Sequence, residues 1–437
     1  MSKVKIIDLF AGIGGIRKGF ELAFREEGIE TECVFTSEIK EHAKIVLSKN
    51  YNNEKIHGDI TQIDTTEIPD FDFLLGGFPC QSFSNAGKRL GFLDTRGTLF
   101  FDIERIIKAK KPYGFILENV EGLVTHDREN PKDDIGKTLS IILAKLDKLG
   151  YKVSWKVLNS KNFGVPQERK RIYIVGTKKA YISLDKFEKK HIFIESILEC
   201  GLPTNESKLS KLLLQHYTPT ELLGKSIKDK RGGKSNIHSW DIELKGSVSA
   251  EQKELLNLIF KERRKKVWAE ELGIVWMDGM PLTEKQIFSF YPHKNLNALL
   301  TDLKEKGYLK LEHPKDIVEE PTENGIKRSR AQKTSLPKGY NIVAGKLSFE
   351  INKILHPKGI APTLVAMDMK KIFVVDNDKL RTLSLREGLR LFGYPEDYEM
   401  PVELNQGYDL LGNTVVVPVI KSISERLAKQ YLSCRNI

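Results

Sequence analysis

Apolar runs of strand length alternate with amphipathic stretches along the first third of the chain. The runs that predict strands are KVKIIDLF, ECVFTSE, KIHGDI, FDFLLGGF, YGFILENV and RIYIVGT. The stretches with helical spacing of apolar residues include IRKGFELAFREEG, EHAKIVLSKNY, LFFDIERIIKAK and KTLSIILAKLDKLG. This alternation predicts β-α-β units and therefore an α/β fold with a doubly wound, mostly parallel sheet. In such sheets, ligands bind at the carboxyl ends of the strands.

The pattern changes after about residue 190, and residues 200–345 are polar and basic. Within them, a short stretch with helical spacing is followed by the strand-like run YLKLE. The leucines on its one helical face are Leu296, Leu299, Leu300 and Leu303. This arrangement fits a small helix-turn-helix unit with a wing near 280–315, or equally a packing helix with a hairpin. A helical period returns at RTLSLREGLRLFGYP, and the chain ends with an apolar segment and the amphipathic helix KSISERLAKQYL.

Composition narrows the class of protein. The 437 residues carry a net charge of +11, which favours a polyanionic partner such as nucleic acid, although a solvated lysine-rich surface also fits. No apolar stretch reaches the length of a membrane span and no secretory signal opens the chain, so we expect a cytoplasmic protein. The four cysteines form no CxxC pair, so we expect reduced thiols and no metal site.

A glycine-rich loop follows the first predicted strand. In DLFAGIGGIRKGF, the glycines Gly12, Gly14 and Gly15 lie between a strand and a helix, where a cofactor can approach the backbone. No Lys-Ser/Thr follows, so the loop is not a phosphate-binding P-loop. Arg17 occupies the third glycine position of the GxGxxG pattern, which disfavours a dinucleotide oxidoreductase.

Acidic residues follow the next two predicted strands. Glu38 comes roughly 20 residues after the loop, where a carboxylate can hold ribose hydroxyls. Asp59, in HGDI, can accept a hydrogen bond from an adenine amino group. Either residue alone fits a helix cap or a surface charge. Together with the glycine loop they indicate an adenosine-containing cofactor, and the lack of phosphate-binding chemistry favours S-adenosyl-L-methionine.

Four further residues have the chemistry of a catalytic site. Cys80 lies on a loop after the run FDFLL, where the alternative is a small buried apolar residue. Glu118 follows the apolar run YGFIL at a strand end, where burial would raise the pKa of its carboxyl group enough for acid catalysis; the alternative is a helix cap. Arg169 and Arg171 alternate, so both point to one face, where they suit carbonyl or phosphate oxygens or are simply solvated.

Several motifs together resemble one enzyme family. DLFAGIGG, GGFPCQSFS, ENV, QERKRIYIVG, RTLSLREGLRLFGYP and GNTVVVPV have the order and rough spacing seen in DNA (cytosine-5)-methyltransferases of the bacterial restriction-modification type. The resemblance covers about residues 4–177 and 360–425 and implies the S-adenosylmethionine-dependent methyltransferase fold. It also implies a catalytic domain at 1–190, an irregular target-recognition domain at 191–405, and a C-terminal segment, 406–437, that completes the first domain.

The resemblance implies roles for the four candidate catalytic residues. The thiolate of Cys80 adds to C6 of a cytosine that has been flipped out of the duplex. Glu118 holds or protonates N3, and Arg171 binds the O2 oxygen. Arg169 steadies the Cys80 loop or contacts a phosphate. C5 then accepts the methyl group, and loss of the C5 proton releases Cys80.

The same resemblance implies binding residues. Those matching cofactor positions are Phe10, Ala11, Gly12, Ile13, Gly14, Gly15, Glu38, Ile39, Asp59, Ile60, Pro79, Leu99, Asn413, Thr414 and Val415. Those expected to contact DNA are Gln81, Ser84, Lys88, Arg89, Thr363 and Leu364.

The implied partner is double-stranded DNA, in a monomeric enzyme that works alongside a cognate restriction endonuclease. Two related alternatives stay open at this point. An RNA cytosine-5 methyltransferase of the same fold would carry the same catalytic set, although the long basic middle favours DNA. A non-catalytic DNA-binding regulator would retain the fold, although intact Cys80, Glu118 and Arg171 argue against a loss of activity.

Overall fold

The computed structural model divides the chain into two compact units. The described residues are all except 1–2, 53, 79–98, 131, 230–232, 234, 278, 323–324, 344–348, 367 and 435–437. Unit 1 comprises Met1–Cys200, His356–Lys370 and Leu383–Ile437, and unit 2 comprises Gly201–Leu355 and Lys371–Thr382. The chain therefore returns to unit 1 at His356 and again at Leu383, both earlier than the boundary at residue 406 expected from the sequence.

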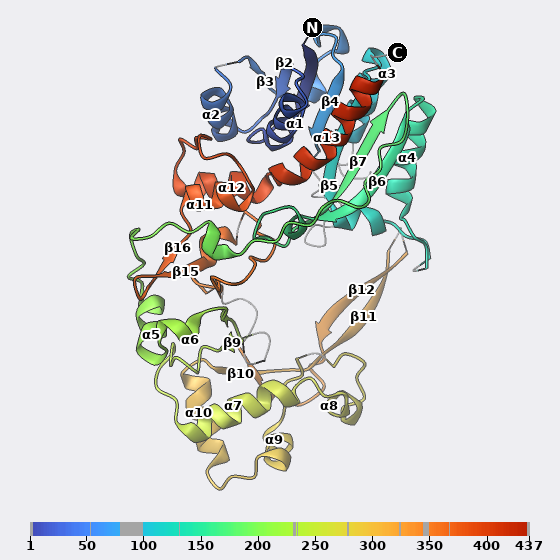
Figure 1. Cartoon of the computed structure of the whole chain (residues 1–437). Helices are drawn as coiled ribbons and strands as arrows, with labels where there is room; N and C mark the ends of the chain where they lie inside the picture. The colour runs from blue at the N-terminus through green and yellow to red at the C-terminus, as the bar shows by residue number, and fades with distance from the viewer. Residues whose placement is uncertain are drawn as a thin grey trace. The chain divides into compact units, whose positions relative to one another are not determined.

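Unit 1 is built on a sheet that, within the described residues, has seven strands in the order β3-β2-β1-β4-β5-β7-β6 (Figure 1). Their bounds are β1 (Val4–Leu9), β2 (Thr31–Ser37), β3 (Ile56–His57), β4 (Phe73–Gly77), β5 (Gly114–Val120), β6 (Lys152–Asn159) and β7 (Lys170–Thr177). Strands β1 to β5 pair in parallel, and β7 runs antiparallel to both of its neighbours. The predicted doubly wound, mostly parallel α/β sheet is confirmed.

The antiparallel strand β7 is a departure from the simple β-α-β alternation. The run RIYIVGT forms β7 as expected, but it follows β6, in KVSWKVLN, which the sequence pattern did not reveal. Residues 160–169 join the two strands with only a short 3-10 turn and no crossover helix, so the pair must be antiparallel. Most residues of β6 are only half buried, which explains its weak apolar signal.

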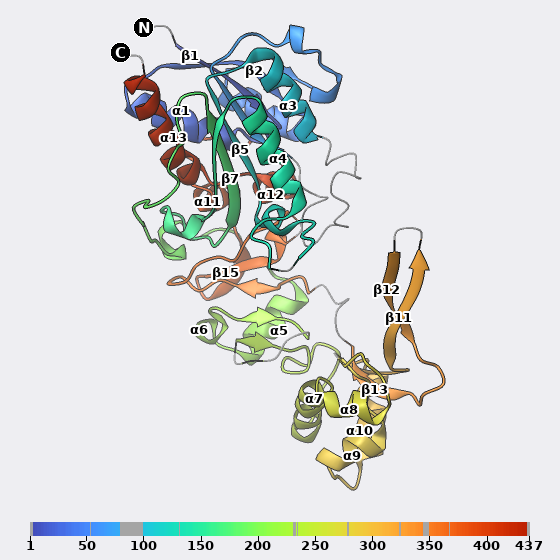
Figure 2. The same cartoon turned by 90° about the vertical axis from the view of Figure 1, so that its right-hand side faces the viewer.

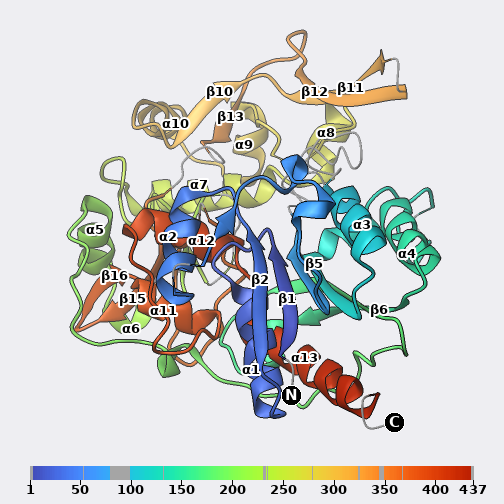
Figure 3. The same ribbon diagram turned by 90° about the horizontal axis from the view of Figure 1, so that it is seen from above.

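Helices cover both faces of this sheet (Figure 3). Helices α1 and α13 pack together on one face, where a Cβ on Gly19 would lie only 2.7 Å from Ile420. The side chains of α3 and α4 complete the core on the other face. The run TVVVPVI leads into α13, which begins at Val417, earlier than the expected helix. The bounds are α1 (Gly15–Glu26), α2 (Glu41–Asn50), α3 (Leu99–Lys110), α4 (Lys137–Lys148), α11 (Leu385–Leu391), α12 (Leu404–Asn413) and α13 (Val417–Ser433).

Unit 2 contains two hydrophobic cores. One lies under a small sheet in the order β16-β15-β14-β8-β9, and the other lies among α7, α9, α10 and the β10–β13 pair. The helices are α5 (Lys208–His216), α6 (Pro219–Leu222), α7 (Ala250–Glu262), α8 (Lys266–Glu271), α9 (Glu284–Phe290) and α10 (Leu296–Glu305). The strands are β8 (Ser226–Ile227), β9 (Asn236–Ile237), β10 (Leu309–Glu312), β11 (Lys315–Thr322), β12 (Gly325–Gln332), β13 (Gly339–Ile342), β14 (Lys353–Ile354), β15 (Ile372–Asp376) and β16 (Lys379–Thr382).

The helix and strand predicted near 280–315 are confirmed as α10 and β10. Leu296, Leu300 and Leu303 are buried on one face of α10, and Leu299 packs against the same core. Short 3-10 helices complete the secondary structure at η1 (Ile60–Gln62), η2 (Thr65–Glu67), η5 (Glu121–Thr125), η6 (Ser160–Asn162), η7 (Ile194–Ser196) and η8 (Met369–Lys371). Among the described residues, every helix is too short or too polar to cross a membrane.

Candidate active site

The strand order of unit 1 reverses between β1 and β4, which defines where a ligand binds. Leu9, the last residue of β1, pairs with Ser37 of β2 on one side and Gly76 of β4 on the other. In a doubly wound sheet this switch point opens a crevice at the carboxyl ends of the strands. The predicted residues at or close to the carboxyl ends of the strands include Gly12, Glu38, Asp59 and Glu118. The fold therefore brings them to one edge of the sheet.

Glycine is needed at the positions of the first loop for different structural reasons. Gly12 has a φ of +56°, and within the described part of the chain no atom lies within 4 Å of the position a Cβ would take, so these residues leave its side of the loop open. A Cβ on Gly14 would lie 2.8 Å from the ring of Tyr51, and a Cβ on Gly15 would lie 2.6 Å from the hydroxyl oxygen of Tyr394. Gly12 therefore leaves room for a ligand, whereas Gly14 and Gly15 allow close packing.

Glu38 shapes the glycine loop as well as facing the site. Its Oε2 accepts a 2.7 Å hydrogen bond from the backbone N–H of Gly12, and its Oε1 accepts 2.8 Å bonds from the N–H groups of Ile39 and Lys40. The side chain of Ile39, next to this buried carboxylate, is 66% exposed. The pair thus offers acceptor oxygens beside an apolar surface, as an adenosine group requires.

The remaining cofactor candidates in the first half of the chain contribute less directly. Asp59 is exposed, but its Oδ1 caps η1 by accepting from the N–H of Thr61 at 3.0 Å and from its hydroxyl at 2.9 Å. The helix-cap alternative for Asp59 therefore applies to one of its oxygens. The side chain of Ile60 lies in the core, and Leu99 begins α3 in a half-buried position.

The C-terminal candidates pack against the glycine loop from the other end of the chain. The hydroxyls of Thr414 and Tyr394 are 2.6 Å apart, and a Cβ on Gly15 would lie 2.8 Å from Val415. Asn413 is the last residue of α12 and donates to the carbonyl of Asp409 at 2.7 Å. The segment Asn413–Val415 therefore supports the loop.

Two tyrosines of this region were not foreseen. The hydroxyls of Tyr394 and Tyr398 both donate to the backbone carbonyl of Ile13, at 3.5 and 2.5 Å. They fix the glycine loop from outside the sheet. The motif FGYP contains Tyr394, but nothing in the sequence indicates which loop its hydroxyl contacts.

Glu118 and Arg171 form a buried ion pair at the carboxyl end of β5. The Arg171 Nε lies 3.1 Å from Glu118 Oε1, and Glu118 is only 9% exposed. Burial raises the pKa of the Glu118 carboxyl above its usual value, although the charges of Arg171 and Arg169 oppose that rise. Gly77 of β4 lies beside Glu118 in the sheet, and the missing side chain leaves space next to the carboxylate. Burial therefore favours the protonated form of Glu118 more than water would.

Arg169 has a different environment from Arg171. Its guanidinium is buried and donates to the backbone carbonyls of Leu364, Thr414 and Gly412 at 2.9, 2.9 and 3.2 Å. The alternative of two solvated charges is thus wrong for Arg169, which ties the start of β7 to the C-terminal segments of unit 1. These contacts define a positioning residue.

The two DNA-contact candidates in the described part of the chain are placed differently. Thr363 is exposed, and its hydroxyl donates to the carbonyl of Glu168 at 2.7 Å. The side chain of Leu364 is completely buried, so a direct contact between that side chain and DNA does not fit this structure. Its carbonyl serves Arg169 instead.

The loop after β4 carries the remaining candidates. Pro79, Cys80, Gln81, Ser84, Lys88 and Arg89 lie outside the described residues. The residue before them, Phe78, accepts a 3.2 Å hydrogen bond at its carbonyl from the amide of Asn119. Asn119 therefore fixes the start of the Cys80 loop next to Glu118, a role that the sequence did not reveal. Among the described residues, no cluster of acidic, histidine or cysteine side chains suits a metal ion.

The strands also enclose charged groups beneath the glycine loop. Arg17, whose position disfavoured a dinucleotide, is buried and binds both carboxylate oxygens of Glu54 at 2.6 and 2.9 Å. Asp8 of β1 is also buried, and burial raises the pKa of its carboxyl to about 8 against the opposing charge of Arg17. Nothing in the sequence indicated that these two side chains would be buried charged groups close to the glycine loop.

The sheet order of unit 1 is that of the methyltransferase fold. Solved methyltransferases share the fold: EhMeth of Entamoeba histolytica has a TM-score of 0.54 at 16% identity, with 99% of each chain covered. The Schizosaccharomyces pombe Dnmt2 structure has a TM-score of 0.51 at 14% identity, with both chains fully covered.

The chain belongs to the C-5 cytosine-specific DNA methylase family, whose model matches residues 4–429. It is 62% identical to the type II methyltransferase M.NlaIV of Neisseria lactamica, covering 98% of this chain and 99% of the relative. It is 40% identical to M.BanI of Aneurinibacillus aneurinilyticus, covering 97% and 96%. The protein is therefore a DNA (cytosine-5)-methyltransferase of restriction-modification type, which disfavours the RNA-modifying, regulatory and oxidoreductase alternatives.

Proposed function

We propose that the enzyme transfers a methyl group from S-adenosyl-L-methionine to C5 of a cytosine flipped out of duplex DNA, through a covalent bond between Cys80 and C6. The single observation that supports this most is the buried pair of Glu118 and Arg171 at the carboxyl end of β5. In sequence, Cys80 comes three residues after the neighbouring strand β4 ends at Gly77. An acid with a raised pKa next to a nucleophile is what addition to a pyrimidine ring needs.

The proposed chemistry follows from the weak nucleophilicity of C5. The thiolate of Cys80 adds to C6, and Glu118 holds a proton at N3 so that negative charge does not accumulate on the ring. Arg171 holds the O2 oxygen and keeps Glu118 in place. After C5 has gained the methyl group, its proton leaves to a base, the electrons of the C5–H bond restore the double bond, and the Cys80 thiolate is expelled. A stacked cytosine cannot reach these groups, so the base must leave the duplex.

The residues of the glycine loop fit the proposed methyl donor. S-adenosyl-L-methionine, when bound, supplies an electrophilic methyl group on a sulfonium. The open side of Gly12 allows it to approach the backbone, the oxygens of Glu38 can accept from ribose hydroxyls, and the exposed Ile39 side chain can cover a purine ring. Asp59 is exposed at the end of the neighbouring strand and can accept from an adenine amino group. The loop offers no P-loop lysine for a phosphate.

The remaining assignments complete the proposal. Gln81, Ser84, Lys88, Arg89 and Thr363 contact the DNA around the flipped base, as their match to the family motifs suggests. Unit 2 carries target recognition. The enzyme acts as a cytoplasmic monomer on double-stranded DNA together with a cognate restriction endonuclease, in keeping with the type II methyltransferases that it resembles.

Trapping the covalent intermediate tests the mechanism. On a duplex with 5-fluorocytosine in place of the target base, the C5 fluorine cannot leave as a cation, so Cys80 should stay bonded to C6 after methyl transfer. Mass spectrometry of the digested complex should locate the nucleotide on the peptide containing Cys80. A crosslink at another side chain, or none under turnover conditions, would falsify the covalent route.

Two serine variants complete this experiment. Cys80→Ser should abolish methyl transfer while leaving the affinity for duplex DNA unchanged. Cys200→Ser is the matched control, because Cys200 is an exposed free cysteine outside the site. We expect this control to retain full activity and to form the 5-fluorocytosine adduct.

A further inference from the structure

The second core of unit 2 organises a self-contained module of a recognisable plan. Along the chain come helix α7, the short helix α8, a single strand position at Leu282, helices α9 and α10, strand β10, the β11–β12 hairpin and strand β13. Leu282 and Tyr340 exchange backbone hydrogen bonds of 2.9 and 2.7 Å, and β13 pairs antiparallel with β10. Apart from the additional six-residue helix α8, this is the order of a winged helix-turn-helix domain: helix, strand, two helices, strand, long hairpin and strand.

The hairpin takes the place of the wing. Strands β11 and β12 pair over eight residues each, and Figure 2 shows them standing apart from helices α7–α10. A two-stranded hairpin is marginally stable alone, so its base must be held by other contacts. Asp316 provides them, because its carboxylate accepts from the N–H groups of Val275 and Trp276 at 3.0 and 3.3 Å. Arg330 of the opposite strand lies over the Trp276 ring, 4.5 Å from its centroid.

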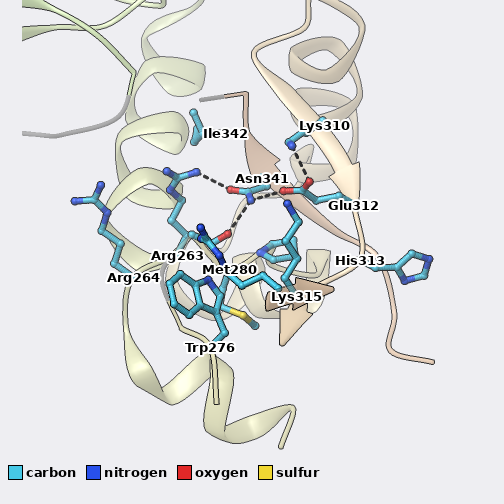
Figure 4. A pocket seen from close by; sticks show the side chains of 13 residues that line it. Arg263, Arg264, Trp276, Met280, Lys310, Glu312, His313, Lys315, Asn341 and Ile342 are labelled. Carbon is cyan, nitrogen blue, oxygen red and sulfur yellow. Dashed lines mark hydrogen bonds and ion pairs between the residues drawn. The ribbon is translucent and has the colours of Figure 1, made fainter. Parts of the chain in front are cut away.

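A basic pocket of about 220 Å³ lies where the hairpin meets the module. Figure 4 shows a buried scaffold at its wall, in which Arg263 donates to the side-chain oxygen of Asn341 at 2.7 Å. The amide of Asn341 donates in turn to Glu312 at 2.6 Å, and Lys310 is paired with the same carboxylate at 2.6 Å. The described arginines and lysines that line the pocket are Arg263, Arg264, Lys310, Lys315 and Arg330.

The charge of this pocket points to an anion. Among the described residues that line it, Glu312 is the one carboxylate, and both Lys310 and Asn341 already bind it. Arg264, Lys315 and Arg330 are exposed, so their charged ends can meet a ligand. Guanidinium and ammonium groups gathered around a small, open pocket suit a phosphate group. The volume is below that of an ordinary small-molecule site, which disfavours a free nucleotide.

We propose that residues 250–342 are a winged-helix module whose pocket at the base of the hairpin holds a backbone phosphate of the substrate duplex. The inference rests on DNA being the substrate of the enzyme. It gives the protein a second DNA-binding site that involves neither the flipped cytosine nor the Cys80 loop. Contacts of this kind position a protein on a duplex and carry no base sequence themselves.

The salt dependence of DNA binding tests this site in the full-length enzyme. We expect Arg264→Ala/Lys315→Ala/Arg330→Ala to weaken binding of duplex DNA by about tenfold or more, as the loss of charge-assisted bonds predicts. The slope of log affinity against log salt should become shallower by about 0.9 for each phosphate that the variant no longer neutralises. At saturating DNA, kcat should stay unchanged. The charge-conserving variant Arg264→Lys/Arg330→Lys should keep the wild-type slope of log affinity against log salt.

The control removes three exposed lysines from the edge of unit 1 opposite to the catalytic edge. Lys108 and Lys148 lie in the last turns of α3 and α4, and Lys152 begins β6, so all three lie at the amino ends of their neighbouring strands. The triple alanine variant at these positions has the same net charge as the test variant and should retain the wild-type slope and affinity.

Each outcome has one meaning. A wild-type enzyme that methylates DNA, with a test variant of unchanged thermal midpoint, affinity and slope, would overturn the phosphate site. An equal loss of affinity in both triple variants would also overturn it, since net charge alone would then explain the effect. A wild-type enzyme that transfers no methyl group to duplex DNA would instead overturn the proposed function.

Discussion

In unit 1 the charged groups of the site are buried and paired, whereas those around the pocket of unit 2 are largely exposed. Glu118 and Arg171 compensate each other where little of either side chain is exposed, so the pKa of Glu118 can differ from its usual value. Arg264, Lys315 and Arg330 are accessible to solvent and salt. Catalysis needs groups that have shifted pKa values and fixed positions, whereas binding of a DNA backbone needs positive charges that are accessible from solvent. Single substitutions should therefore have large effects in unit 1 and small, salt-dependent ones in unit 2.

The sharpest test of this difference is Glu118→Gln. Glutamine keeps the size and hydrogen-bonding ability of the side chain but cannot exchange a proton with N3. We expect kcat to fall by about 10²- to 10⁴-fold, the usual contribution of a general acid, while the affinity for DNA and methyl donor changes little. Single-turnover kinetics separate the two effects.

The matched control for Glu118 is Glu121→Gln, three residues further along the chain. Glu121 is exposed, and its carboxylate lies 3.6 Å from the ammonium group of Lys170. Because an exposed ion pair of this kind contributes little, we expect the Glu121→Gln enzyme to keep an activity within about twofold of wild type. A loss in the Glu118 variant smaller than tenfold would contradict the acid role and the contrast between the units.

A second test uses the buried carboxyl of Asp8. Its folded-state pKa is raised from 3.8 to about 8, so between these values the folded protein keeps a proton that the unfolded chain has lost. The free energy of unfolding should therefore fall as pH rises from about 4 to about 8, by at most about 1.4 kcal/mol per pH unit. Asp8→Asn should remove this part of the decline and stabilise the enzyme at pH 8.

Urea unfolding at a series of pH values measures this effect. The control is Asp70→Asn, because Asp70 is 94% exposed. Its stability curve should parallel that of the wild type across the same range. Parallel curves for Asp8→Asn and wild type would mean that Asp8 is not protonated in the fold, and the picture of unit 1 as the unit that buries its charges would weaken.

The smallest expected effects come from a pair of glycine variants. In Gly15→Ala the new methyl group would meet Tyr394 at 2.6 Å and Val415 at 2.8 Å, so we expect a loss of about 1 to 3 kcal/mol of stability from overpacking. In Gly12→Ala the new methyl group meets no atom of the described residues within 4 Å, so the expected cost is the left-handed backbone strain, about 1 kcal/mol. However, it should weaken methyl-donor binding more than Gly15→Ala does.

Thermal unfolding and calorimetric titration with S-adenosyl-L-methionine distinguish these two glycines. The expected pattern is a reciprocal one, with Gly15→Ala the less stable variant and Gly12→Ala the weaker binder. If Gly12→Ala binds the methyl donor as the wild type does, the open side of the loop is not the cofactor's route of approach.

Local patterns predicted the elements that carry the site. The apolar runs placed β1 to β5, the spacing of leucines placed α10, and the motifs with their family resemblance singled out Glu118 and Arg171. What the sequence missed depends on distant contacts. Arg169 binds carbonyls 195, 243 and 245 residues away, and no local signal reveals such partners. The same is true of the burial of Leu364 and of the tyrosine hydroxyls that hold Ile13.

The antiparallel direction of β7 was missed for a related physical reason. Period-2 patterns indicate that a segment is a strand, but strand direction depends on how the chain travels between neighbours. Residues 160–169 contain no crossover helix. A connection this short indicates an antiparallel pair, just as the apolar run that follows indicates a strand. The hairpin of unit 2 was likewise left open between two alternatives, because its anchoring at Asp316 arises from residues 40 and 41 positions earlier.

The packing of Thr414 and Val415 on the glycine loop has a consequence for the order in which the enzyme folds during its synthesis. The glycine loop is made early in synthesis, but part of its support comes from Thr414 and Val415, which are made much later. A growing polypeptide can therefore finish unit 2, and so become able to hold DNA, while its methylating centre is still incomplete. Translation that stops before Thr414 should yield a fragment that binds DNA without methylating it.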